Sequence, residues 1–282
     1  MTWVFFVLTS VVFLSLTNIL QRALMKKQDS NPIVYATIFQ LFCTLIVGSI
    51  AFARGFIMPP VSEFPFNFLL LALLYAGMNF FLFKAYQTTE ASNVTILMSS
   101  RALWTIAVAL LFLGETFTIT KILGTVIILL AVFLVTKRQK DFRISKGELY
   151  ILAAALCLGV ASANDAYILR TAEPFSFTVF AFLFPSLVLL ALHPKTLIEA
   201  KQFLNKNLVW KLIILSLVFS IAVLASSLAY AYGALASQAA PIQNSAVILT
   251  VLLATIFLKE RDNLIKKFLA AILVVVGVSL LT

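Results

Sequence analysis

The sequence is built from apolar runs of about 20 residues, the length an α-helix needs to cross the hydrocarbon core of a bilayer. Hydrophobic residues make up 62% of the chain and charged residues 11%, against roughly 25% charged residues in a typical soluble domain. A soluble protein of this composition lacks the polar groups to cover its surface. The runs do not alternate polar and apolar residues, as the strands of a membrane barrel do. The sequence therefore predicts an all-α integral membrane protein.

Ten apolar runs can be drawn, and we predict ten transmembrane helices. They cover residues 3–23, 33–53, 64–86, 92–113, 118–136, 147–169, 175–193, 209–232, 240–258 and 264–281. The connections between them are short, and the longest, residues 194–208, is expected to form a surface helix. The first run is expected to be a retained helix rather than a signal peptide, because no Lys or Arg precedes it.

The two halves of the chain share a spacing. Ala91 stands 24 residues before Glu115, and Ala236 stands 24 residues before Glu260. Each of these glutamates is followed by one last apolar run. Self-similarity of this kind indicates an internal repeat.

The repeat divides the chain into two five-helix units, residues 1–138 and 144–282. Because five is odd, the second unit must enter the membrane from the opposite side. We therefore predict two inverted five-helix repeats around a central cavity. Inverted repeats are common in secondary transporters, which bind solute near the midplane between the repeats.

The motif residues of both halves also carry a family resemblance. They are Ala85-Tyr86-x4-Ala91-Ser92-Asn93, Phe112-Leu113-Gly114-Glu115, Gly124, and the looser second copy Leu258-Lys259-Glu260-Arg261. They resemble the EamA-type branch of the drug/metabolite transporter superfamily. The resemblance implies a ten-helix carrier in which helices 1, 3, 4, 6, 8 and 9 enclose the cavity. The chain departs from the family at Ala102 and Val247, where members often carry Pro.

Polar side chains at membrane depth are costly to bury, so they are candidates for a solute site. Arg101 lies about ten residues, or roughly 15 Å, from either end of its run. Three interpretations of Arg101 stay open: carbonyls or an acid hold it, it attracts an anionic group of the solute, or the run is wrongly drawn. Asp165 either pairs with Arg101 across the cavity or lies at the interface near Arg170.

The candidate residues fall into two groups. The substrate-cavity candidates are Asn18, Asn79, Arg101, Trp104, Asp165, Ser227, Tyr230, Gln243 and Asn244. Gly114, Glu115 and Glu260 are expected to be structural, with each glutamate capping the helix that follows it. No metal or cofactor is expected, because the single His and the two Cys residues have no metal-binding spacing.

We expect a secondary transporter of the cell membrane that moves a small organic metabolite or drug, such as an amino acid, by alternating access. A carrier of anionic sugar phosphates or nucleotide sugars is the alternative. A membrane-embedded enzyme or a channel is the alternative from another class, but the chain carries no P-loop, zincin or nucleophile-elbow motif. The expected partners are the solute and the bilayer, not nucleic acid. A monomer is expected, with a homodimer as the alternative.

The basic residues predict the orientation in the membrane. Of the 21 Lys and Arg residues, 17 lie at the junctions between an odd-numbered run and the run that follows it. The other four are Arg54, Arg101, Lys121 and Arg170. The positive-inside rule places the more basic side in the cytoplasm and hence both termini outside. The family resemblance implies cytoplasmic termini instead, and we follow the charge pattern.

Overall fold

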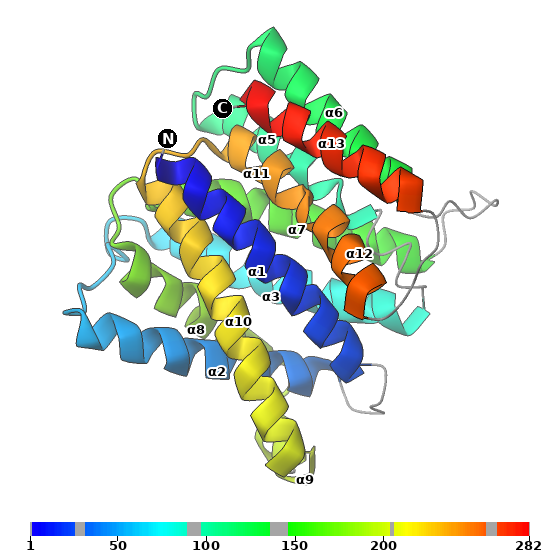
Figure 1. Ribbon diagram of the computed structural model, residues 1–282. Coiled ribbons are helices and arrows are strands. Elements are labelled where there is room, and N and C mark those ends of the chain that lie inside the picture. The colour runs from blue at the N-terminus through cyan, green and yellow to red at the C-terminus, as the bar shows by residue number, and fades with distance from the viewer. Residues whose placement is uncertain are drawn as a thin grey trace.

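The computed structural model describes residues 2–25, 32–88, 97–135, 146–203, 206–257 and 264–281. All regular secondary structure in these ranges is α-helical, which confirms the all-α class. The helices are α1 (Thr2–Met25), α2 (Pro32–Ala53), α3 (Pro65–Thr88), α5 (Arg101–Phe112), α6 (Ile119–Val135), α7 (Lys146–Ile168), α8 (Pro174–Leu192), α9 (Thr196–Phe203), α10 (Lys206–Ala231), α11 (Ala236–Asn244), α12 (Ala246–Phe257) and α13 (Leu264–Leu281). Figure 1 shows them as one bundle of inclined helices.

The length and composition of six helices allow them to cross a membrane. These six are α1, α2, α3, α7, α8 and α10, and three shorter apolar segments lie in α5, α6 and α13. Large apolar side chains on the outer faces, among them Phe66, Leu111 and Val275, are exposed. The chain is a multi-pass membrane protein.

The count of ten spans is not confirmed, and two predicted runs are wrong as single helices. The run drawn over 92–113 is interrupted at Ser99 and Ser100, after which α5 begins. The run drawn over 240–258 is divided between α11 and α12 at Ser245. An apolar run predicts the length of a membrane segment but does not register a local break within it.

Pro241 is the second residue of the run drawn over 240–258, but the helix that contains it begins earlier. Pro241 lies inside α11, which begins at Ala236. Residues 236–240 are helical because the Glu115 carboxylate accepts hydrogen bonds from the first free N–H groups of α11.

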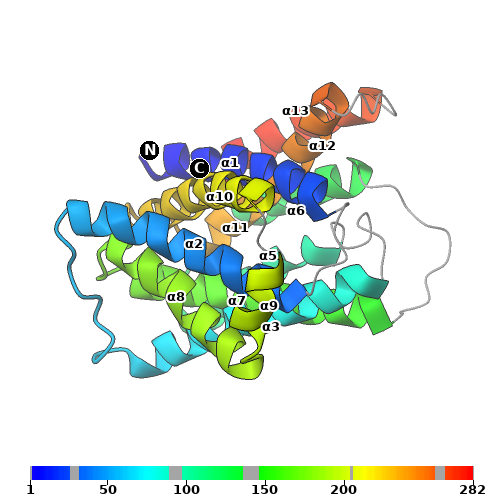
Figure 2. The ribbon, with the colours of Figure 1, turned by 90° about the horizontal axis from the view of Figure 1, so that it is seen from below.

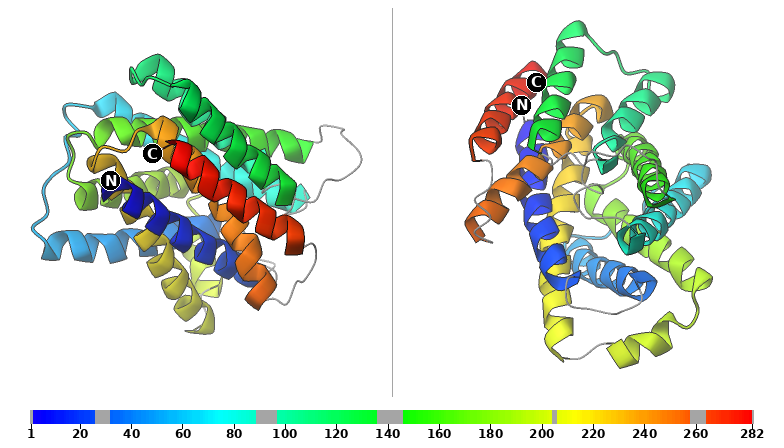
Figure 3. Two further views of the ribbon diagram at one scale, coloured as in Figure 1. Left: turned by 45° about the horizontal axis from the view of Figure 1, so that its top comes forward. Right: turned by 90° about the vertical axis from the view of Figure 1, so that its right-hand side faces the viewer.

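The principal helix pairings are symmetric between the two halves. α3 packs along α7 and α1 packs along α10, while α2 pairs with α8 and α6 pairs with α13. In the second half α7 is the counterpart of α1, and α10 is the counterpart of α3. The α3–α7 and α1–α10 pairings are therefore equivalent. The α2–α8 and α6–α13 pairings each join a helix to its own counterpart. Figure 2 shows α2 beside α8, and Figure 3 shows α6 beside α13 at one edge of the bundle. This is the arrangement expected of two repeats.

Close approach of α6 and α13 depends on a glycine from each helix. A Cβ atom on Gly124 would lie 2.8 Å from the carbonyl oxygen of Gly277, and one on Gly277 would lie 2.5 Å from Cγ1 of Ile128. Small residues allow such contacts between membrane helices, where packing rather than hydrophobicity drives association.

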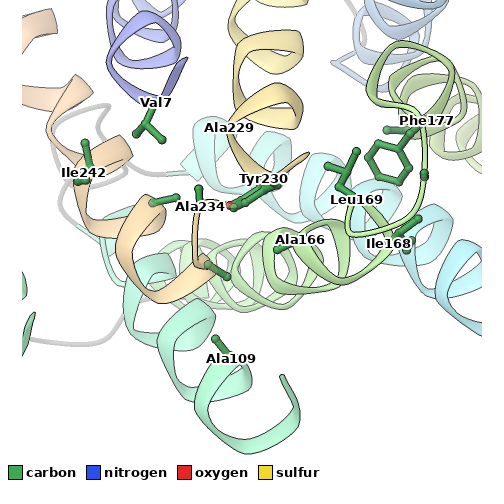
Figure 4. Close-up of a cluster of buried hydrophobic side chains, with 14 of the residues drawn as sticks. Val7, Ala109, Ala166, Ile168, Leu169, Phe177, Ala229, Tyr230, Ala234 and Ile242 are labelled. Carbon is green, nitrogen blue, oxygen red and sulfur yellow. The ribbon is translucent and has the colours of Figure 1, made fainter. Parts of the chain in front are cut away.

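The largest buried apolar cluster lies where the two halves meet. Figure 4 shows Val7 of α1, Ala109 of α5, Ala166 of α7 and Ile242 of α11 around the end of α10, which carries Tyr230. Many members of the cluster are alanines, so the helix backbones come close together there. This cluster borders the candidate site.

The predicted surface helix within 194–208 is confirmed as α9. It follows the C-cap of α8, where His193 Nε2 lies 3.1 Å from Glu199 Oε1. The N- and C-terminal ends of the chain lie on the same side of the bundle (Figure 1).

Two cysteine substitutions test the orientation that the charge pattern predicts. Ser62 follows α2 and Lys146 begins α7, and both are exposed. In a chain lacking Cys43 and Cys157, Ser62→Cys should react with a membrane-impermeant maleimide in intact cells, because its side is poor in Lys and Arg. Lys146→Cys should react only after the cells are opened. The reverse labelling pattern would place both termini in the cytoplasm.

Candidate solute site

The two helix breaks lie at equivalent positions of the repeats. Ser100 and Ser245 each stand nine residues after the alanine that marks the repeat, Ala91 or Ala236. The Ser100 hydroxyl donates to the carbonyl of the residue three positions earlier at 2.6 Å, and the Ser245 hydroxyl does the same at 2.6 Å. The same two carbonyls also accept the backbone N–H of Ser100 and of Ser245, so each serine holds the tight turn at a break through two hydrogen bonds.

The two breaks touch each other. Asn244 Nδ2 donates to the backbone oxygen of Ser99 at 2.6 Å, and these two residues are repeat counterparts. A contact between counterparts lies close to the axis that relates the repeats. Asn244 is 2% exposed, so the contact is buried inside the bundle.

Arg101 belongs to the same contact. Its Nε donates to Asn244 Oδ1 at 2.9 Å, so the amide of Asn244 bridges Arg101 and Ser99. In the described part of the chain no carboxylate lies within ion-pair distance of Arg101. The second-half counterpart of Arg101 is Ala246, so only one repeat brings a charge to the axis.

A second polar group, Asp165, shares two tyrosine neighbours with Arg101. Asp165 Oδ2 accepts a hydrogen bond from the Tyr75 hydroxyl at 2.6 Å, and Asp165 is 8% exposed. Tyr75 and Tyr230 are each within electrostatic range of both Asp165 and Arg101. Neither predicted partner of Asp165 is found, because Arg101 bonds to Asn244 and Arg170 bonds to the backbone oxygen of Leu113.

A glycine brings α5 against α7 and so sets the place of Arg101. A Cβ atom on Gly159 would lie 2.6 Å from the backbone oxygen of Arg101 and 2.6 Å from Trp104 Cβ. Thr105 Oγ1 donates to the Gly159 oxygen at 3.0 Å. The bare backbone of α7 therefore supports the first turn of α5.

Some predicted cavity residues lie in this group and others do not. Arg101, Asp165, Tyr230 and Asn244 come together, and the adjacent Gln243 donates to the Ser226 hydroxyl at 2.7 Å.

The remaining candidates have other contacts. Ser227 shares a buried hydrogen bond with Thr178, and Asn79 donates to the carbonyl of Tyr75 in its own helix. Asn18 is exposed and reaches Thr250 on α12 at 3.4 Å. Trp104 is 42% exposed. Within the described ranges, none of these four side chains is hydrogen-bonded to Arg101 or Asp165.

Glu115 caps a different helix from the one predicted. Its carboxylate accepts hydrogen bonds from the backbone N–H of Ala236 at 2.8 Å and of Ser237 at 3.0 Å, so it caps α11 of the other repeat and not the following α6. The reason is Gly114, whose φ of +66° turns the chain at the end of α5 and is readily adopted only by glycine. Glu260 lies outside the described residues.

The Glu115 cap is expected to matter for transport as well as for stability. Glu115→Ala should cost about 1 kcal/mol in the free energy of unfolding, the usual effect of losing a helix cap, and should also slow solute exchange because the cap ties the repeats together at α11. Glu173 is the matched control, since it caps α8 within its own repeat through the N–H groups of Phe175 and Ser176. Glu173→Ala should lower thermal stability in detergent with little change in exchange rate. Equal effects of the two substitutions on exchange would contradict a linking role for Glu115.

Sequence reasoning missed Tyr75, Ser99, Ser100 and Gly159. The repeat spacing aligns Ser100 with Ser245 and Ser99 with Asn244, so it relates the two breaks to each other but does not reveal them. No comparable signal marked Tyr75, one tyrosine among the 7 of an aromatic-rich chain.

A family model now adds to these observations: the model of the EamA-like transporter family matches residues 1–137 and 145–282. The chain belongs to the EamA-like transporter family. It is therefore a membrane transporter of the drug/metabolite transporter superfamily. The two matches correspond to the two repeats of this EamA-like transporter, and the sequence between them carries Arg138, Lys140 and Arg143.

The fold is found in solved structures. One of 27 matching chains, described as "Crystal structure of protein", has a TM-score of 0.79 and 15% sequence identity over 100% of this chain and 96% of its own. At that identity the likeness shows the fold alone. No curated protein matches the sequence.

Proposed function

We propose that this EamA-like transporter is a secondary carrier that moves a small organic solute with an anionic group, such as an amino acid, across the cell membrane by alternating access. The observation that carries the proposal is the meeting of two helix breaks at equivalent repeat positions, with Arg101 beside them. Broken helices at the interface between inverted repeats are typical of carrier binding sites.

Arg101 is the proposed anchor for the anionic group. Among the described residues the side chain of Arg101 bonds only to Asn244, through Nε. Its two terminal nitrogens are therefore the groups proposed to bind a carboxylate or phosphate, which a guanidinium binds in a bidentate manner. A buried charge without an ionised partner is costly, and a bound anion would offset that cost.

The repeats also supply a physical basis for alternating access. In the proposed ten-helix, inverted arrangement, exchanging the conformations of the two repeats opens the central site to the opposite side of the membrane. One chain contains both repeats, so a monomer is the proposed working unit. A site bounded on both sides by the repeats favours a carrier over a channel.

Proteoliposomes containing the purified chain provide the test. They are incubated with a mixture of amino acids, sugar phosphates, nucleotide sugars and other metabolites, and the solutes that enter are identified by mass spectrometry. We expect at least one anionic or zwitterionic solute to enter with saturable kinetics, and no such uptake in vesicles containing Arg101→Gln. Uptake of no solute class, or uptake that does not depend on Arg101, would overturn the proposal.

A further inference from the structure

We infer that Asp165, with Tyr75 and Tyr230, forms a second end of the site that binds a protonated amine, so that the solute is a zwitterion. This inference rests on the proposed function, in which Arg101 binds the anionic end. It selects between the two solute classes that the sequence left open.

The first observation is an unsatisfied carboxylate. Tyr75 donates to Oδ2 of Asp165 at 2.6 Å, whereas Oδ1 of Asp165 has no hydrogen-bond partner within the residues the structure describes. No Lys or Arg of the described ranges makes an ion pair with it. An ionised carboxylate buried without a cation costs several kcal/mol, so a cationic group is the partner that this environment lacks.

The second observation is an unsatisfied hydroxyl close by. Tyr230 is 6% exposed, and its hydroxyl oxygen also lacks a hydrogen-bond partner among the described residues. Buried hydroxyls are rarely left unpaired. Tyr230 lies on α10 and Asp165 on α7, so two separate helices direct unsatisfied oxygen atoms to one region.

An ammonium group matches this set of acceptors. It has three N–H donors and no acceptor, which suits Oδ1 of Asp165 and the hydroxyl oxygen of Tyr230. Tyr75 and Tyr230 are each within electrostatic range of both Asp165 and Arg101, so the two ends of the site share these tyrosines as neighbours.

The charge of Asp165 also disfavours the alternative solutes. A phosphorylated sugar or nucleotide sugar carries negative charge without a balancing amine, and Asp165 would repel it. Specificity often depends on such a repulsive group as much as on attraction. The pair of ends therefore favours a solute with one anionic and one cationic group.

The test measures ligand-dependent thermal stabilisation of the purified full chain. The probes are the standard amino acids, the 2-hydroxy acids with the same side chains, and a set of sugar phosphates and nucleotide sugars. We expect the wild-type chain to bind at least one amino acid at least about tenfold more tightly than its 2-hydroxy acid, the loss expected for one hydrogen bond to a charged group.

Two variants separate the ends of the site. Asp165→Asn keeps the size of the side chain and an acceptor for Tyr75, and it should remove the preference for the amine while preserving affinity for the 2-hydroxy acid. Tyr230→Phe keeps the ring and removes the unsatisfied hydroxyl. It should lower the affinity for the amino acid by a smaller factor than Asp165→Asn does. Arg101→Gln should lower the affinity for both the amino acid and its 2-hydroxy acid.

The results distinguish this inference from the proposed function. Unchanged amino-acid affinity in Asp165→Asn, or equal binding of the amino and hydroxy acids by the wild type, would contradict the amine-binding role of Asp165. Neither result would contradict the proposed carrier function. Binding of sugar phosphates or nucleotide sugars alone would also contradict that role of Asp165. Stabilisation by none of the probes would count against both proposals.

Discussion

Arg101→Gln should reduce affinity for the transported solute by at least about 30-fold without preventing folding. Removing one partner of a buried charge pair costs roughly 2–5 kcal/mol, and each 1.4 kcal/mol is about tenfold in affinity. Folding should be preserved, because the only described hydrogen bond of the Arg101 side chain is to the neutral amide of Asn244. A neutral side chain also removes the cost of burying the charge.

Two further variants make the Arg101 measurement specific. Arg101→Lys keeps the positive charge but loses the planar group that binds an acid in a bidentate manner, so its affinity should be intermediate. Lys121→Gln removes a charge from α6, which packs mainly on α13, and it should bind like the wild type. Solute affinities are obtained from concentration-dependent thermal shifts. A wild-type affinity in Arg101→Gln would leave Arg101 with a structural role only.

Gly159→Ala and Gly48→Ala should have opposite effects on thermal stability. A Cβ atom on Gly159 would meet backbone and Cβ atoms of α5 at 2.6 Å, whereas one on Gly48 in α2 would have no atom within 4 Å. Overpacking costs about 1–3 kcal/mol, whereas replacing Gly by Ala in an open helix position gains about 1 kcal/mol. Thermal unfolding in detergent should therefore shift down for Gly159→Ala and up for Gly48→Ala.

The same pair tests how the position of Arg101 is set. Because α7 supports the turn that carries Arg101, Gly159→Ala should also weaken solute binding, and Gly48→Ala should not. If Gly159→Ala left both stability and binding unchanged, the close contact between α5 and α7 would not position the site.

The sequence predicted the parts of the fold that depend on hydrophobic length and on repetition. Runs such as 33–53 and 175–193 agree closely with α2 and α8, because lipid requires an uninterrupted apolar helix there. The breaks at Ser100 and Ser245 escaped detection because serine and alanine are compatible with a membrane helix, and only packing against the other repeat determines where the chain turns. The aligned spacing of the repeats shows only that the two breaks are at equivalent positions.

The candidate site was predicted in part for a similar reason. Arg101 and Asn244 stood out because polar residues at depth are rare, and the structure brings them into contact. The pairing of Asp165 with Tyr75 depends on how α3 packs along α7, and a single sequence does not encode that register visibly. The same holds for Glu115, whose helix partner lies in the other repeat.

Counterflow in proteoliposomes tests the central claim most directly, namely that a single site between the repeats is exposed alternately to the two sides. Vesicles are loaded with unlabelled solute, identified from the uptake mixture, and diluted into a trace of the labelled solute. A carrier predicts a transient accumulation of label above its equilibrium level, and vesicles with Arg101→Gln should show none. A simple rise to equilibrium, at a rate that does not depend on the solute inside, would contradict alternating access.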